Sequence, residues 1–394
     1  MGNHEMLFSR RVREISPYLF AEMDRVEREL KEKGIDVISL GVGDPDLPTP
    51  LPIVSALHRS SLDPVNHRYS PYEGLLEFRQ AAAEWYKRRF NVDLDPLREV
   101  HALMGVKEGV IHFLLSMMDP GDLLLVMDPS YPIYEVGARF AGGEVFRVPL
   151  RESNGFLPDL SFIPKDIAKK AKLLFINYPH NPTSAVASLS FYRDLIQFSR
   201  EYEIIVCNDL VYSELFFDGE RPPSLLQVEG AKERVVEFHS LSKTFNMTGW
   251  RVGFAVGNQE LISALGVIKT NTDSGLFKPI QIASAFALRQ EFREQDYLRE
   301  IYRRRRDLVL SKLKEIGIEV NPPRATFYVW VPLPWGKSSI DFCKKILERC
   351  GVVLGPGVGW GECGEGYFRI ALTLGEERLQ VGLERLTRAI EEGG

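Results

Sequence analysis

The sequence has little of what marks secreted, metal-binding and membrane-spanning chains. Its 394 residues include 4 cysteines, and no two of them form a C-x-x-C pair. Neither a disulfide scaffold nor a zinc site is therefore expected, and reduced cytoplasmic thiols fit better. No apolar run approaches the ~18 residues of a membrane span, and residues 1–13 lack the apolar core of a signal peptide. We expect a cytoplasmic chain that binds no metal and no membrane.

The chain also lacks an excess of positive charge. Its formal net charge is −5 and its pI is about 5.9, whereas a nucleic-acid-binding surface is usually basic. The run from Arg303 to Arg306 is an exception, but helical spacing spreads its charges around the axis. We predict a solvated face paired with acids there, and no nucleic-acid partner.

The pattern of apolar residues indicates an α/β fold. With 44% hydrophobic residues, the chain can bury a large core. Between about Thr49 and Phe286, short apolar runs alternate with helical patterns, which is typical of a mostly parallel sheet between helices. We predict a large domain over residues 49–286. A smaller α+β domain is expected from both chain ends, residues 1–48 with an N-terminal arm and residues 287–394.

One polar stretch combines residue types that suit a cofactor. Ser240, Ser242 and Lys243 follow a predicted strand, and Arg251 lies 8 positions beyond the lysine. A lysine amine can form a Schiff base with an aldehyde cofactor, while hydroxyls and a guanidinium suit a phosphate. Pyridoxal 5'-phosphate carries both groups. Taken alone, the S-x-S-K pattern also fits a polar surface turn with a solvated lysine.

Three other residues stand where a ligand site is expected. Gly105 lies between a predicted strand and a predicted helix, where backbone N–H groups favour an anion, although an ordinary helix start has the same pattern. Asp209 ends a predicted strand at the edge where open α/β sheets bind ligands. Arg369 is flanked by apolar residues in a predicted strand, so its guanidinium should be buried with a partner.

Residues 240–254, S-L-S-K-T-F-N-M-T-G-W-R-V-G-F, resemble the Schiff-base loop of the class I and II aminotransferases. These are fold-type I enzymes that depend on pyridoxal 5'-phosphate. The resemblance implies their fold, with Lys243 as the catalytic residue that holds the cofactor. Similar matches cover residues 16–373 and include D-P-D after Gly43, Y-x-x-x-x-G from Tyr69 and N-x-P-x-N-P-T through Asn181, after which Ser184 replaces the usual glycine.

The resemblance also implies roles for individual residues. In the family, the residues at the corresponding positions hold the cofactor phosphate, stack on its ring, bind its phenolic oxygen or pair with its ring nitrogen. The expected cofactor-binding residues are Gly105, Val106, Lys107, Ser240, Ser242 and Arg251 at the phosphate, with Tyr131, Asn181, Asp209 and Tyr212 around the ring. The expected substrate-binding residues are Tyr18, Gly43, Asn181 and Arg369, the last as a fork for the α-carboxylate.

Two segments imply a partner subunit. Tyr69 matches the family tyrosine that reaches the cofactor phosphate of the neighbouring subunit. The polar stretch from Thr270 to Lys278 either closes over the partner's site or is an ordinary connecting loop. The resemblance therefore implies a homodimer with shared active sites.

The implied reaction is transamination between an L-amino acid and 2-oxoglutarate. Residues 18–22, 270–278 and 364–373 look most like the LL-diaminopimelate aminotransferases, a branch of this family in lysine biosynthesis. Alanine, aspartate or aromatic amino acids remain alternative donors, because enzymes for these share most of the motifs. A C–S lyase dependent on pyridoxal phosphate, which would keep Lys243 and Asp209, also remains. A cofactor-binding regulator would need a DNA-binding segment, and we find none.

Overall fold

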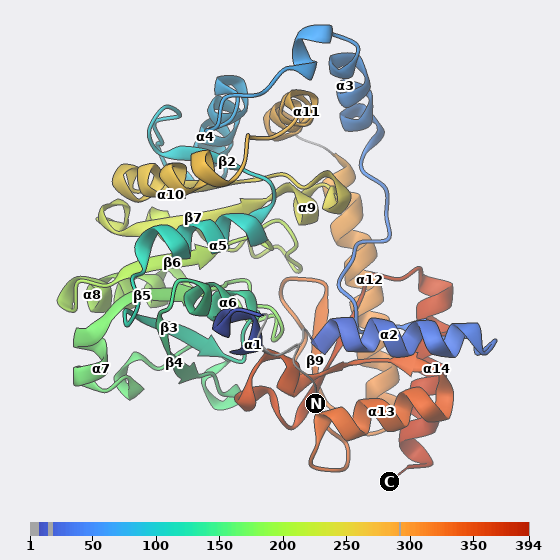
Figure 1. The fold of residues 1–394 in the computed structure, drawn as a ribbon. Helices are drawn as coiled ribbons and strands as arrows, with labels where there is room; N and C mark the ends of the chain where they lie inside the picture. The colour runs from blue at the N-terminus through green and yellow to red at the C-terminus, as the bar shows by residue number, and fades with distance from the viewer. Residues whose placement is uncertain (1–7, 15–18, 291–292, 394) are drawn as a thin grey trace.

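A seven-stranded sheet forms the centre of the larger part of the molecule (Figure 1). The computed structural model describes residues 8–14, 19–290 and 293–393. Within this sheet only β8 runs antiparallel to its neighbours, which confirms the predicted mostly parallel arrangement. In spatial order the strands are β2 (Val100–Leu103), β8 (Gly253–Gly257), β7 (Val235–Ser240), β6 (Ile205–Asp209), β5 (Ala171–Ile176), β3 (Leu123–Asp128) and β4 (Glu144–Pro149).

Helices cover both faces of this sheet because alternate residues of each strand point to opposite sides. Leu124 and Val126 of β3 pack in one apolar cluster, while Leu123, Leu125 and Met127 pack in the other. The first cluster includes side chains from α5 (Val106–Met117), α6 (Ile133–Phe140) and α10 (Gln259–Thr272). The second includes side chains from α3 (Leu51–Ser61), α4 (Leu76–Phe90), α8 (Leu189–Glu201) and α11 (Lys278–Arg289).

A second, smaller unit has its own core and is built from both ends of the described chain. It contains a three-stranded antiparallel sheet and a parallel strand pair, which share one apolar cluster with the surrounding helices. We call it the small unit. It comprises α2 (Leu19–Glu32), β1 (Ile38–Ser39), α12 (Arg293–Glu315), β9 (Tyr328–Pro332), α13 (Ser339–Cys350), β10 (Val352–Val353), β11 (Gly355–Pro356), β12 (Tyr367–Ala371) and α14 (Glu376–Glu391).

The chain passes between the two parts through residues 41–50 and returns along α12 (Figure 1). The predicted boundaries at residues 48/49 and 286/287 fall near these crossings and stay a prediction. Three short helices lie outside the two cores' main layers, namely α1 (Arg10–Glu14), α7 (Lys165–Lys170) and α9 (Leu241–Thr244). No described helix has both the length and the apolar composition needed to cross a membrane. The four cysteines form no disulfide.

Two predicted segments have different bounds in the structure. The polar stretch predicted as a possible loop from Thr270 to Lys278 is helical as far as Thr272 and again from Lys278, so the true loop spans only residues 273–277. The alternating apolar pattern over residues 325–330 predicts a strand from Ala325, whereas β9 begins at Tyr328. Thr326 has a φ of +67°, a left-handed conformation that does not continue a strand.

The prediction of a solvated arginine face over residues 303–306 is wrong for half of the run. Arg303 and Arg304 are partly exposed and paired with acids on the surface. Arg305 and Arg306, however, are only 3% and 5% exposed. Both pair with carboxylates, so the expected pairing is correct while the expected solvation is not.

Candidate active site

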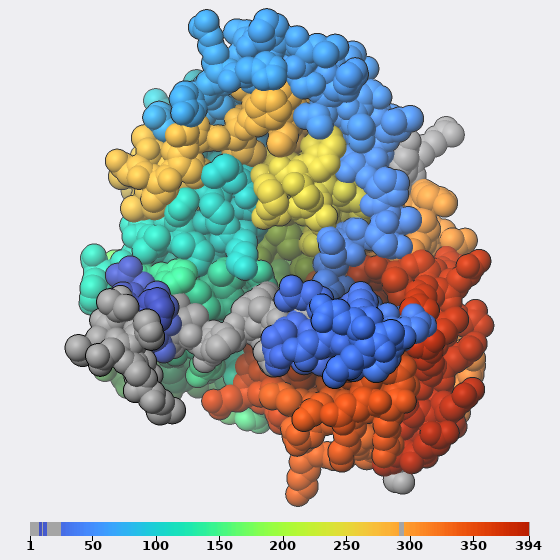
Figure 2. Space-filling model, turned by 45° about the vertical axis from the view of Figure 1, so that its right-hand side comes forward, coloured from blue at the N-terminus to red at the C-terminus, as the bar shows by residue number. Residues whose placement is uncertain are grey.

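A cavity of about 380 Å³ lies between the carboxyl ends of the central strands and the small unit. Figure 2 shows the surface hollowed where the segments that carry α5, α9 and the chain from α2 to α3 meet. Most of the predicted site residues line it, although they come from distant parts of the sequence. Those that line it are Gly43, Val106, Lys107, Tyr131, Asn181, Asp209, Tyr212, Ser240, Ser242, Lys243, Arg251 and Arg369.

Lys243 reaches the cavity from α9, a single helical turn that directly follows β7. Ser240 caps this turn, because its Oγ accepts a hydrogen bond of 3.1 Å from Ser242 N. The Lys243 amine donates to the carbonyl oxygen of Gly43 across the cavity at 3.2 Å. Burial lowers the pKa of Lys243 to about 8, and the positive charges of Arg251 and Arg369 act in the same direction. With this pKa the amine is still largely protonated at neutral pH, and it becomes largely neutral only above about pH 8.

The pairing of β2 with β8 brings Gly105 and Arg251 together. Leu103 pairs with Gly253 in this antiparallel ladder, so the residues two positions beyond each of them face one another. Gly105 has a φ of +90° and precedes α5 as its N-cap. This φ favours glycine, and a β-carbon on Gly105 would also displace the Arg251 guanidinium. This end of the cavity combines a guanidinium, two serine hydroxyls and the N-terminus of a 12-residue helix, which together suit an anion.

Asp209 lies at the carboxyl end of β6, as predicted, and its side chain is buried. Tyr134 donates a hydrogen bond of 2.8 Å to Oδ2, whereas Oδ1 has no hydrogen-bond partner in the described part of the chain. Burial raises the pKa of Asp209 to about 6, while the bond from Tyr134 opposes that rise. A buried carboxylate with one oxygen unpaired is suited to a cationic partner that enters the cavity.

Arg369 enters from β12 of the small unit and is 4% exposed, as expected for an arginine in an apolar strand. Its Nη1 donates to Asn181 Oδ1 and its Nη2 donates to Gly41 O, both at 2.7 Å. The guanidinium carbon lies 3.9 Å from the centre of the Tyr328 ring and 4.2 Å from that of Trp360. Contacts with these two rings restrain the guanidinium.

Sequence reasoning missed several residues that shape the cavity. Tyr134 binds Asp209, and Asn177 donates from Nδ2 to the Asp209 carbonyl oxygen at 2.5 Å. Tyr328 hydrogen-bonds Tyr212 through their hydroxyl groups at 3.1 Å, and it closes the space beside Gly43, where a β-carbon would collide with its hydroxyl. Its alternation within an apolar strand indicated only a core residue. Two of these residues had a usable signal: Asn177 opens the N-x-P-x-N-P-T motif, and Tyr134 follows Tyr131 by three residues in the first turn of α6.

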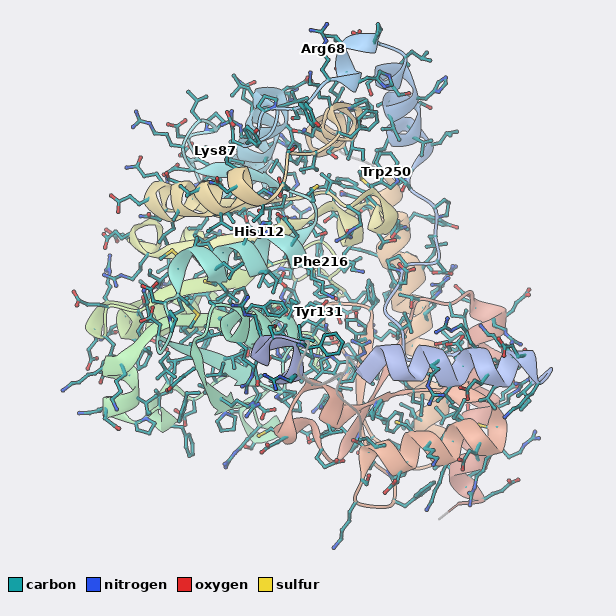
Figure 3. All side chains as sticks on the ribbon, in the orientation of Figure 1. Arg68, Lys87, His112, Tyr131, Phe216 and Trp250 are labelled. Atoms are coloured by element: carbon teal, nitrogen blue, oxygen red, sulfur yellow. The ribbon has the colours of Figure 1, made fainter. Side chains whose placement is uncertain are left out.

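Two predicted site residues in the described part of the chain, Gly105 and Tyr69, do not line the cavity, although Gly105 lies directly against Arg251, which does. Tyr18 lies outside the described residues. Tyr69 is 87% exposed. Figure 3 shows that Arg68, its neighbour in sequence, lies at the end of the molecule remote from Tyr131. Tyr69 therefore does not line the cavity of its own chain.

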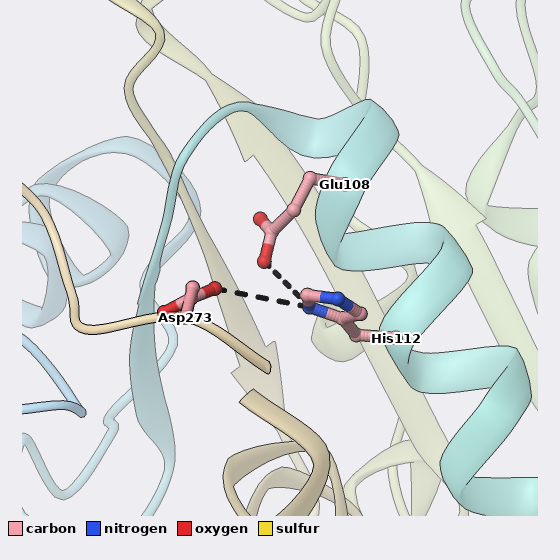
Figure 4. A group of neighbouring side chains, drawn as sticks. All are labelled: Glu108, His112 and Asp273. Atoms are coloured by element: carbon pink, nitrogen blue, oxygen red, sulfur yellow. Dashed lines mark ion pairs between the residues drawn. The ribbon is translucent and has the colours of Figure 1, made fainter. Parts of the chain in front are cut away.

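A cluster of charged residues supports the first turn of α5. Glu108 accepts a hydrogen bond from Met104 N at 3.1 Å, which closes the turn that contains Gly105. Figure 4 shows Glu108 with His112 and Asp273, three possible metal ligands. The Lys269 ammonium lies 2.5 Å from Glu108 and 2.7 Å from Asp273, so a cation already fills the space that a metal would need. The prediction of no metal stays a prediction.

Comparisons with known proteins identify the family. A model described as aminotransferase class I and II matches residues 35–386. An LL-diaminopimelate aminotransferase of Aquifex aeolicus is 52% identical over 379 residues, 96% of this chain and 98% of that protein. The substrate-bound BacF structure from Bacillus subtilis superimposes with a TM-score of 0.94 at 36% identity, over 97% of each chain. A mutant Thermus thermophilus aspartate aminotransferase has a TM-score of 0.90 at 30% identity, over 97% of this chain and 99% of that one.

The fold therefore defines an enzyme of fold-type I, a transferase of nitrogenous groups. More particularly, the chain belongs to the class I and II aminotransferases, as its sequence motifs predicted.

Proposed function

We propose that this chain transfers the amino group of LL-2,6-diaminopimelate to 2-oxoglutarate, with pyridoxal 5'-phosphate held on Lys243. The observation that carries the proposal is the single cavity into which Lys243, Asp209 and Arg251 all project. The choice of donor rests on the relative named LL-diaminopimelate aminotransferase, which is 52% identical, compared with 30% for the aspartate aminotransferase structure.

The donor set of the cavity fits this cofactor. Lys243 offers an amine for its aldehyde, and the unpaired Oδ1 of Asp209 suits a protonated ring nitrogen. Arg251, Ser240, Ser242 and the first residues of α5 would hold the phosphate at the other end. Tyr131 would lie against the ring, with Asn181 and Tyr212 at its phenolic oxygen. When bound, the cofactor withdraws electrons from the substrate Cα and carries the amino group between substrates.

The chain's own residues bind the donor and move a proton. Arg369 holds the α-carboxylate, and its contacts with Tyr328 and Trp360 keep its fork fixed. That grip places Cα near Lys243, whose depressed pKa gives a larger fraction of neutral amine than an exposed lysine has, and this amine can accept the Cα proton and later return it. Asp209 stays ionised at neutral pH, held by Tyr134, and supplies the opposing negative charge.

We also propose that the enzyme is a homodimer with shared sites. Tyr69 is 87% exposed and remote from its own cavity, so its phosphate contact would be made in the partner subunit. The loop over residues 273–277 lies beside it, because Gly275 packs closely against the Pro71 carbonyl oxygen. A two-fold interface would give each subunit the other's Tyr69.

A mixture of two inactive variants tests the shared site. Subunits with Tyr69→Phe and subunits with Lys243→Ala should each be impaired. Heterodimers between them contain one site with both defects and one with neither, so activity should exceed that of either parent. No recovery despite proven subunit exchange, or a fully active monomer, would rule the shared site out.

A panel of amino donors tests the reaction. Purified protein with pyridoxal 5'-phosphate and 2-oxoglutarate should form glutamate fastest, by kcat/KM, with LL-diaminopimelate. Alanine, aspartate and phenylalanine serve as competing donors, and a higher kcat/KM for any of them would overturn the donor assignment. Pyruvate release from cystathionine without any oxo acid would instead indicate the C–S lyase.

A further inference from the structure

Arg305 joins the two chain segments that connect the parts of the molecule. It lies on α12, and its guanidinium binds Asp46 with two hydrogen bonds, Nη1–Oδ1 at 2.7 Å and Nη2–Oδ2 at 2.8 Å. The same Nη1 donates to the carbonyl oxygen of Leu372, just beyond β12, at 2.9 Å. The Arg305 side chain is 3% exposed, so this planar fork is shielded from water on most sides.

Asp46 closely follows residues 40–43, whose four carbonyl groups each accept a hydrogen bond from another element. Leu40 O accepts from Ala371 N and Val42 O accepts from Thr373 Oγ1, both at 2.7 Å. Between them, Gly41 O accepts from Arg369. Gly43 O then accepts from the amine of Lys243, which belongs to the larger part of the molecule. The segment is thus the strip of backbone that touches both the carboxylate-binding arginine and the reactive lysine.

We infer that Arg305 is a positioning residue for the amino-acid substrate, acting through Asp46 on the backbone of residues 41–43. This inference rests on the proposed transamination. Arg305 joins Asp46, three residues beyond Gly43, to Leu372, three residues beyond Arg369, so it ties together the two stretches that carry these cavity residues. Without the hydrogen bonds from Arg305 to Asp46, residues 41–43 are held only by single hydrogen bonds. The Gly41 carbonyl oxygen, which accepts a hydrogen bond from Arg369, is then no longer fixed in position.

The predicted consequence concerns substrates and not the cofactor. Arg305 touches no group at the Arg251 and Gly105 end of the cavity, where the phosphate is proposed to bind. Both the amino donor and 2-oxoglutarate present an α-carboxylate to Arg369 in the proposed reaction. Loss of the Arg305–Asp46 interaction should therefore weaken the binding of both substrates.

Arg306 supplies a matched control on the same helix. It is also buried, and it also binds an acid and a carbonyl oxygen, namely Asp218 at 2.7 Å and Pro323 O at 3.0 Å. None of its hydrogen bonds reaches residues 41–46. A generic cost of losing a buried arginine from α12 should appear equally in Arg305→Met and Arg306→Met.

The test compares Arg305→Met, Arg305→Lys and Asp46→Asn with Arg306→Met as holoenzymes. For the first three we expect KM for the amino donor and for 2-oxoglutarate each to rise about tenfold, the order of effect of a misplaced clamp. The dissociation constant of pyridoxal 5'-phosphate should stay within about twofold of wild type, a bound well below the effect of a misplaced clamp. Arg306→Met should keep wild-type KM values. Adding Asp46→Asn to Arg305→Met should cause little further rise, because both remove one interaction.

Unchanged KM values in Arg305→Lys and Asp46→Asn, or an equal rise in Arg306→Met, would overturn the inference. If Arg305→Met does not fold, the two conservative variants decide, since Asp46 is 25% exposed and its amide keeps the shape of the side chain. A wild-type enzyme that transfers no amino group from any donor would instead refute the proposed function. The two failures are therefore distinguishable.

Discussion

Two buried carboxylates on neighbouring strands differ in one respect. Asp209 ends β6 and Glu237 lies on β7, and burial raises the pKa of both. Glu237 accepts four hydrogen bonds, which come from Tyr86, Asn208, Ser224 and Leu225 N. Asp209 has one unpaired oxygen among the described residues. Burial alone therefore does not identify a functional acid. An acid that lines a cavity and has an oxygen without a hydrogen-bond partner is the better candidate.

The same contrast holds for two lysines. Lys269 is fully buried, and its ammonium contacts two carboxylates. Lys243 donates one hydrogen bond of 3.2 Å to a carbonyl oxygen, and its pKa falls to about 8. Buried charged groups outside the cavity are thus paired with other groups of the chain, while Lys243 and Asp209 in the cavity keep hydrogen-bonding capacity for a ligand. Five measurements test this distinction.

The largest effect is expected at Lys243. Lys243→Ala should lower the transamination rate at least about a thousandfold, because proton transfer by a positioned group contributes 10²–10⁴. Borohydride reduction of the wild-type holoenzyme and peptide mapping should label Lys243. Label on Lys107 or Lys278 would contradict the assignment. Lys269→Met is the comparison, and it should retain the label at Lys243 while losing stability, since it leaves two carboxylates unpaired.

The two carboxylates should respond in opposite ways to amide substitution. Asp209→Asn should lower kcat about 10- to 100-fold, the loss of one charge-assisted interaction. It should also stabilise the cofactor-free protein at pH 7, because a pKa raised from 3.8 to about 6 reflects a cost of about 3 kcal/mol for the buried charge.

Glu237→Gln should do the reverse. The amide presents hydrogens to donors that now bind an oxygen, so stability should fall by about 1–3 kcal/mol while activity per folded molecule is kept. Thermal unfolding of the cofactor-free variants, together with steady-state rates, measures both effects. Equal losses of activity in the two variants would remove the distinction between these acids.

A smaller effect is expected at the fork of Arg369. Arg369→Lys should raise KM about tenfold for every amino donor, since a lysine retains charge but loses one of two parallel hydrogen bonds. Cofactor affinity should not change. If only a single donor were affected, Arg369 would recognise a side chain and not the shared carboxylate.

A shift in pH dependence, without loss of function, is expected for the lysine amine. Burial depresses the pKa of Lys243 to about 8, so raising the pH through 8 converts the folded side chain to its reactive neutral form. An exposed lysine stays protonated until about pH 10.4. The rate at which the cofactor-free protein captures an aldehyde on Lys243, measured by reduction and peptide mapping, should therefore have its midpoint near pH 8. A midpoint above 10 would show that the amine is solvated.

The smallest effect is expected from metal removal. The cluster of Glu108, His112 and Asp273 already holds the Lys269 ammonium, so it belongs with the paired charges. Dialysis against a chelator should leave both the unfolding temperature and the rate unchanged. If the unfolding temperature or the rate fell and added zinc or magnesium restored it, a metal ion would bind to this cluster in place of the Lys269 ammonium.

The sequence was sufficient for the fold class and for most of the cavity, because local patterns carry both. Strand and helix periodicity predicted the parallel sheet, and the motif around Lys243 predicted which loops meet at its edge. Arg305 and Arg306 were not predictable in this way. Their acid partners lie 259 and 88 positions away in the sequence, so helical spacing alone could not show which side of α12 is buried.

The bounds of some elements were not predictable because they depend on the backbone conformation of single residues. Thr326 and Ser184 both have positive φ, at +67° and +62°, and their hydroxyl groups bind each other at 2.6 Å. Neither residue type signals a left-handed backbone, so the start of β9 was placed too early. The stretch from Thr270 was predicted as a possible loop for another reason, since the last turn of α10 is polar.

The ladder between β2 and β8 also limits how the length of this chain can vary. Gly105 meets Arg251 only because each lies two residues outside the Leu103–Gly253 pair. Insertion or deletion of one residue between β2 and Gly105, or between Arg251 and β8, would turn the neighbouring side chains to the opposite face. Insertions and deletions should therefore be excluded from these two short stretches. They should be accommodated far more easily at exposed turns such as residues 152–155, where a β-carbon on Gly155 meets no atom within 4 Å.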